Sequence, residues 1–225
     1  MNKTTRQFLI TVEEGKRLIS RAVAAMEPVQ RAAKEGTLVI VAGTTNGYLA
    51  EQLLEQFGQK DDFTRVGFRR GANVGPGGKP ETGPFANTDV VIRAGQWLRG
   101  KTICDIAPEL GEGDVIVKGA NAVQADRKVA AIQIGHPQFG TISPILTAVM
   151  GRRARLVIPV GLEKRVIGDI VTELEAISSL TGAKAALIAA GGIAGAEGSG
   201  TFAVTGDEEQ LAAAEALLRG VREAQ

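Results

Sequence analysis

One segment fixes the class of this fold: Leu38-Val39-Ile40-Val41-Ala42-Gly43-Thr44-Thr45-Asn46-Gly47-Tyr48-Leu49-Ala50. Its apolar start is typical of a strand buried on both faces, and its end opens a helix. Between them lies a loop of glycines and small hydroxyl residues, Gly43 to Gly47. The free N–H groups and positive dipole end of a helix start bind phosphate or carboxylate, and glycines let the ligand approach closely. Alternatively, Thr45 or Asn46 simply caps the helix.

Composition narrows the function classes. The chain has 225 residues, of which 44% are apolar, so it can bury one substantial core or divide into a main domain and a small appendage. Its 26 basic and 25 acidic residues leave a net charge of +1, which argues against nucleic acid as a partner. No signal peptide or membrane span is visible, so we expect a cytoplasmic protein. The chain has a single cysteine, Cys104, which excludes an intrachain disulfide. The residues around it predict a half-buried side chain that contributes to packing.

Strands and helices alternate along the chain. A helix with a capping-box start at Thr11 is expected to run to about Ala33, before the strand at 37–43 and its helix. Further strands are expected at 89–95, 114–119, 128–135 and 155–160, with a helix from Thr141 to Met150. The alternation predicts an α/β fold, with a three-layer, Rossmann-like and mainly parallel sheet.

The chain is expected to divide near residue 160. Residues 1–160 form the main domain, with an N-terminal helix and a glycine-rich loop at 58–88. Residues 161–225 form a small α+β extension, completed by the strand at 155–160 and containing helices at 164–180 and 207–222. Its βαββα order suits a small ferredoxin-like subdomain or an extension of the main sheet. The glycine-rich link at 191–200 lies between two expected strands, which favours a flexible turn over a dinucleotide fingerprint.

Three glycine-bearing turns follow expected strands, and the carboxyl ends of parallel strands meet at one edge of a sheet. We therefore expect these turns to converge on one ligand pocket. They are Gly43-Thr44-Thr45-Asn46-Gly47, Lys118-Gly119-Ala120-Asn121-Ala122 and Gly135-His136-Pro137-Gln138-Phe139-Gly140-Thr141.

These turns resemble those of a known superfamily over residues 30 to 162. It unites ribose-5-phosphate isomerase, glucosamine-6-phosphate deaminase, CoA transferases, lactate-utilisation proteins, and initiation-factor regulatory subunits with their methylthioribose-1-phosphate isomerase relatives. The resemblance rests on Val41-Ala42-Gly43-Thr44-Thr45, on Asp114 to Ala122, on Gly140-Thr141 and on Leu156-Val157-Ile158-Pro159-Val160. It implies a phosphorylated or carboxylated ligand at the carboxyl edge of the sheet, and isomerase-like or transferase-like chemistry.

One position departs from that family. Where the isomerase relatives carry the Asp of a Gly-Ala-Asp turn, this chain has Asn121, which cannot transfer a proton as a base. Asn121 can hydrogen-bond a ligand, or it can close a turn. His136 and Lys118 are then the remaining candidates for proton transfer. For His136 the alternative is a structural or solvated histidine without a role in catalysis.

If the 58–88 loop folds over the expected pocket, its cations and the following Arg93, Arg99 and Lys101 would suit an anionic ligand. Arg65, Arg69, Arg70 and Lys79 lie in the 58–88 loop, with Gly75 to Gly78 as a hinge if the loop is a lid. Dispersed surface charge is the alternative for these residues, and also for Glu163 and Lys164 after the strand at 155–160. No metal-ligand spacing is present, and no cofactor is identified.

Two functions follow from these patterns. The first is an enzyme that binds a small anionic metabolite through Gly43 to Gly47, Gly119 to Asn121, Gly140, Thr141, Arg69 and Arg70. The second is a non-catalytic module of the same fold that senses a ligand or assembles as a homo-oligomer.

Overall fold

The computed structural model describes residues 5–70, 84–85, 88–166, 171–191 and 199–223. The chain divides into two units, Met1–Val166 and Ile167–Gln225, and each is described by itself. In the first unit the elements are α1 (Val12–Ala24), α2 (Glu27–Glu35), β1 (Thr37–Ile40), α3 (Thr44–Gln56), β2 (Val90–Arg93), β3 (Gln96–Trp97), α4 (Ile103–Ile106), the 3-10 turn η1 (Ala107–Glu109), β4 (Val115–Val117), β5 (Ala122–Gln124), β6 (Val129–Ala131), α5 (Ile142–Leu146), the π-helical turn η2 (Thr147–Gly151), β7 (Arg155–Val157) and the 3-10 turn η3 (Leu162–Lys164).

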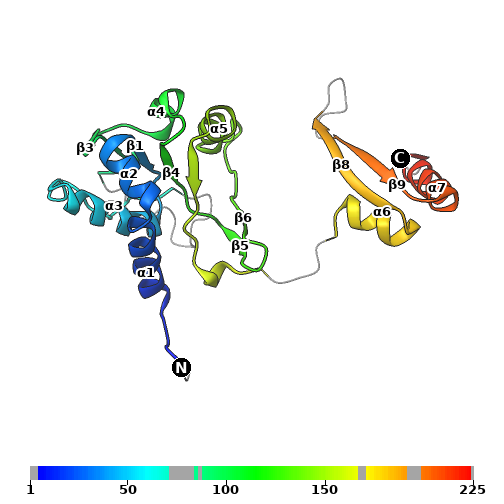
Figure 1. The fold of residues 1–225 in the computed structure, drawn as a ribbon, viewed down its shortest axis with the longest axis horizontal. Helices are drawn as coiled ribbons and strands as arrows, with labels where there is room; N and C mark the ends of the chain where they lie inside the picture. The colour runs from blue at the N-terminus through cyan, green and yellow to red at the C-terminus, as the bar shows by residue number, and fades with distance from the viewer. Residues whose placement is uncertain (1–4, 71–83, 86–87, 167–170, 192–198, 224–225) are drawn as a thin grey trace. The chain divides into compact units, whose positions relative to one another are not determined.

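A five-stranded mixed sheet organises the first unit, which confirms the α/β class (Figure 1). Its order is β3-β2-β1-β4-β7. β1, β4 and β7 are parallel, whereas β2 is antiparallel to β1 and to β3, so only part of the expected parallel sheet is present. Asp89 explains the antiparallel direction of β2. Its Oδ1 accepts a hydrogen bond from the N–H of Ala42 at 2.9 Å. This bond holds the start of β2 at the edge where β1 ends, so β2 runs back along β1.

Apolar side chains cover both faces of the sheet. Along β1, Leu38 and Ile40 belong to one core cluster, while Val39 and Val41 belong to another. The first cluster includes side chains of α1, α2 and α3, and the second includes side chains of α4 and α5. Burial on both faces explains why this strand is a continuous apolar run.

The helix expected from Thr11 to Ala33 is two helices. α1 begins with the expected capping box of Thr11 and Glu14 and ends at Ala24, and α2 starts at Glu27. Pro28 in the first turn of α2 accounts for the break, because a proline lacks an N–H and clashes with the carbonyl four residues earlier.

The strand expected at 128–135 is shorter and does not join the main sheet. β6 pairs antiparallel with β5 in a separate hairpin, which lies beside the sheet in Figure 1. Only a few residues separate β5 from β6, and such a short connection produces an antiparallel pair.

The second unit contains α6 (Glu173–Thr181), β8 (Lys184–Gly191), β9 (Ser199–Thr205) and α7 (Glu208–Glu223). β8 and β9 form an antiparallel hairpin. The strand expected to complete this extension is β7, which instead pairs with β4 in the first unit. The helix expected at 164–180 begins only at Glu173, where Thr172 and Glu175 form a capping box.

Candidate functional site

The first turn of α3 begins directly after β1. Its N-cap residue, Gly43, has an extended backbone and no side chain that could cap the helix. The N–H of Gly47 is the first to donate within the helix, to the carbonyl of Gly43 at 2.8 Å, so the N–H groups of Thr44, Thr45 and Asn46 have no acceptor inside the helix. This is the arrangement that binds an anion at a helix start.

Asn46 has a different role from the loop residues around it. Its side chain is 1% exposed, and its Nδ2 donates to the carbonyl of Val41 at 2.7 Å and to that of Val117 at 3.2 Å. Asn46 therefore ties the helix start to the ends of β1 and β4. Its Oδ1 is buried without a hydrogen-bond partner among the described residues.

A cavity of about 280 Å³ opens beside this turn. Three cations and one carboxylate line it, together with small and aromatic residues. The lining residues are Glu13, Lys16, Thr44, Gly47, Tyr48, Arg65, Phe68 and Arg69. Lys16 pairs with Glu13, and Arg65 pairs with Glu51 at 2.6 Å. In the part of the chain that the structure describes, Arg69 forms no ion pair.

Tyr48 contacts Arg65 and also Glu13, the ion-pair partner of Lys16. The guanidinium of Arg65 lies over the Tyr48 ring, 4.0 Å from its centroid, and the Tyr48 hydroxyl donates to Glu13 Oε2 at 2.7 Å. Hydrogen bonds from Lys16 and Tyr48 hold the pKa of Glu13 below its usual value. Gly47 makes room for Arg65, because a Cβ there would lie 3.1 Å from the Arg65 Cγ.

A second charged cluster lies at the same edge of the sheet and centres on Asp89. The Asp89 side chain is fully buried and pairs with Arg70 at 3.0 Å. Its two oxygens also accept hydrogen bonds from the N–H groups of Ala42 and Ile103. Asp89 thus joins the end of β1 to the start of α4 and holds Arg70 in place.

Lys118 follows β4 and belongs to this cluster. Burial lowers the pKa of its amine, and so does the positive charge of Arg70; Asp89 opposes the shift, and Lys164 adds to it. Lys164 donates to the carbonyl of Ala120 at 2.7 Å, which places this cation beside the turn after β4. Arg70 and Lys164 outnumber the carboxylate of Asp89, so the cluster is electropositive.

The turn at Gly119 to Asn121 connects β4 to the β5–β6 hairpin. Asn121 is exposed; its Oδ1 accepts from the N–H of Gln133 at 3.0 Å, and its own N–H donates to Ala131. Both bonds close the hairpin, as the turn interpretation of Asn121 expects. The Oδ1 of Asn121 is therefore engaged by the backbone.

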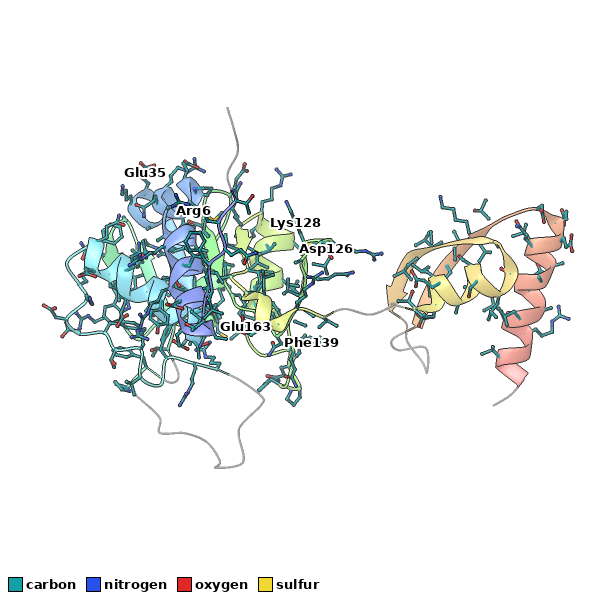
Figure 2. The ribbon with its side chains drawn as sticks, turned by 90° about the horizontal axis from the view of Figure 1, so that it is seen from below. Arg6, Glu35, Asp126, Lys128, Phe139 and Glu163 are labelled. Atoms are coloured by element: carbon teal, nitrogen blue, oxygen red, sulfur yellow. The ribbon has the colours of Figure 1, made fainter. Side chains whose placement is uncertain are left out.

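The third expected turn makes local hydrogen bonds only, among the described residues. His136, Pro137 and Gln138 are exposed. Figure 2 shows Phe139 at the margin of the unit, and its side chain is 58% exposed. Thr141 precedes α5 and its side chain does not cap the helix, which continues directly into the π-helical turn η2.

The structure also describes several other residues for which the sequence makes predictions. Arg93 pairs with Glu109 and Arg99 with Asp62, so these cations are engaged away from α3. Cys104 is exposed, contrary to the half-buried packing expected for it, because residues 103–106 form a helical turn with Ile103 and Ile106 inside. Lys79, the hinge at 75–78 and most of the 191–200 link lie outside the described residues.

Sequence reasoning missed three contributors to the site. Glu13 and Lys16 come from α1, and nothing in the sequence pairs them with Tyr48, 35 and 32 positions away. Asp89 could have been recognised, because it is an acid directly before a continuous apolar strand. A carboxylate buried at such a position requires several hydrogen-bond donors.

None of the helices in the described part of the chain has both the length and the apolar character needed to span a bilayer. Among the described residues, no group of three or more His, Cys, Asp and Glu side chains is placed to hold a metal ion. No family model matches the chain, and neither a curated protein nor a solved structure shows significant similarity to it.

Proposed function

We propose that the chain binds a small phosphorylated or carboxylated metabolite at the start of α3. The observation that carries the proposal is the cavity itself: it opens on Thr44 and Gly47 and is lined by Lys16, Arg65 and Arg69. Helix N–H groups supply directional donors, and the guanidinium groups supply charge and paired donors suited to phosphate or carboxylate. Because Arg69 has no ion-pair partner among the described residues, an incoming anion does not have to displace a carboxylate from it.

We infer further that the first unit has the three-layer, Rossmann-like fold of the superfamily that unites ribose-5-phosphate isomerase with the CoA transferases. Support comes from the parallel strands β1, β4 and β7, from helices in the core clusters of both sheet faces, and from the turn motifs. The engagement of Asn121 Oδ1 in the hairpin favours ligand binding over the proton transfer that the isomerase relatives perform.

Thermal-shift measurements with inorganic phosphate, ribose 5-phosphate, ATP, CoA and citrate test the binding proposal. A ligand at 100 times its dissociation constant stabilises the folded state by about 2.7 kcal/mol. We expect at least one of these anions to raise the melting temperature, and Arg69→Ala to remove that effect. Lys34→Ala is the matched control, because it removes an exposed cation from α2. No stabilisation at millimolar concentrations of any of them would contradict the proposal.

A second candidate function is assembly through the second unit. Among its described residues only Ile177, Ala183 and Ala214 are buried apolar side chains, whereas Leu180, Leu187, Ile188 and Val221 are more than half exposed. α6 packs against β8 and α7 against β9, and the exposed apolar side chains leave surface that a second copy would bury. Light scattering should therefore report an oligomer for the full chain and a smaller species for Ile188→Glu. A monomer in both proteins would exclude assembly through these side chains.

A further inference from the structure

Lys118 is a half-buried amine without a carboxylate of its own. In the described structure it takes part in no ion pair, and its Nζ lies 3.4 Å from the carbonyl oxygen of the adjacent Gly119, the limit of a hydrogen bond. Buried lysines usually have a paired acid. Lys118 therefore differs from Lys16 and Lys60, each of which pairs with a glutamate.

The neighbours of Lys118 are fixed by other partners. Arg70 is held by Asp89, and Lys164 is held by the carbonyl of Ala120. Among the described residues, Asp89 is the carboxylate that acts on Lys118, and two backbone N–H groups and Arg70 already occupy its oxygens. Two cations that are held by other partners therefore act on the amine.

This environment increases the neutral, nucleophilic fraction of the amine. Burial and the two cations lower the Lys118 pKa, the effects by which proteins activate a lysine for attack on a carbonyl. The same two cations attract the phosphate or carboxylate of a molecule whose carbonyl carbon approaches Lys118.

We propose that Lys118 forms an imine with small carbonyl compounds that also carry a phosphate or carboxylate, the anionic group lying against Arg70 and Lys164. The neutral amine adds to the carbonyl carbon, a proton moves from nitrogen to oxygen, and loss of one water molecule leaves the C=N bond. Addition of water reverses the step and releases the carbonyl compound. The proposal rests on Arg70 and Lys164, not on the cavity beside Thr44.

Reductive trapping with pyridoxal phosphate tests this proposal, with pyridoxal as the probe that lacks the phosphate. Borohydride adds hydride to the imine carbon and leaves a stable secondary amine, which peptide mass spectrometry locates. We expect Lys118 to be labelled first and at least about tenfold faster by pyridoxal phosphate than by pyridoxal, because bound phosphate positions the aldehyde. Lys118→Arg should remove this fast labelling.

Lys128→Arg is the matched control. Lys128 is exposed at the turn of the β5–β6 hairpin, where Figure 2 shows it at the surface, and its replacement should leave the fast labelling intact. Circular dichroism checks that both variants fold. Labelling spread evenly over exposed lysines, or unchanged in Lys118→Arg, would overturn the proposal; equal rates for the two probes would overturn its requirement for an anion. Fast labelling of Lys118 without any thermal shift by phosphate would contradict the α3 site alone.

Discussion

The Nδ2 atom of Asn46 lies 3.2 Å from the carbonyl oxygen of Val117, so a side chain in the first turn of α3 is bonded to the end of β4. The same nitrogen lies 2.7 Å from the carbonyl oxygen of Val41 after β1. One amide therefore satisfies two buried carbonyls and fixes where the N–H groups of Thr44 and Thr45 lie at the sheet edge. The proposed anion site depends on this link.

Asn46→Ala should lower the free energy of unfolding by about 1–3 kcal/mol, because the variant leaves two buried carbonyls without this donor. Urea denaturation measures the change. Gln52→Ala on the exposed face of the same helix serves as the control and should change stability by less than about 0.5 kcal/mol. Equal stabilities of the two variants would show that the Asn46 bonds do not support the helix start.

Asp89→Ala should be more destabilising, by about 3–5 kcal/mol, because it removes a fully buried carboxylate that binds two N–H groups and Arg70. Asp126→Ala is the matched control, since Asp126 pairs with Arg165 at the surface. Its loss should cost less than about 1 kcal/mol. A small effect of Asp89→Ala in urea denaturation would argue against Asp89 as the residue that aligns β1, β2 and α4.

Lys118→Met should make stability less dependent on pH above neutrality. The pKa of Lys118 is lowered in the folded protein, so between that pKa and the ordinary lysine value the unfolded chain binds more protons. The stability of the original chain therefore rises with pH across this window, whereas Lys118→Met lacks that contribution. Urea denaturation at several pH values up to about 10 measures the difference. Parallel pH profiles of the two proteins would contradict the lowered pKa.

The sequence was most informative where local chemistry decides the structure. The apolar run of β1 and the loop after it indicated a buried strand followed by a helix, and Thr11 with Glu14 indicated a helix start. These features depend on neighbouring residues only. The position of Lys118 directly after β4 was equally predictable, because a short β-branched run defines that strand.

Features that depend on distant contacts were not predictable. The antiparallel direction of β2 follows from the contact between Asp89 and Ala42, which are 47 positions apart. Residues 135–141 follow the β5–β6 hairpin, which is not part of the main sheet, so the argument from parallel strand ends does not apply to this turn. The arrangement of Tyr48 with Glu13 and Arg65 likewise joins three separate segments.

A nuclear magnetic resonance titration with inorganic phosphate tests the central claim most directly, because it observes the backbone N–H groups that would bind the anion. We predict that the amide resonances of Thr44, Thr45 and Asn46 shift in a saturable manner, and that Arg69→Ala weakens this response while Lys34→Ala does not. The start of α7, where Glu208 and Glu209 disfavour anions, should remain unchanged. Absence of any shift at residues 44–46, or equal shifts at the start of α7, would contradict an anion site at α3.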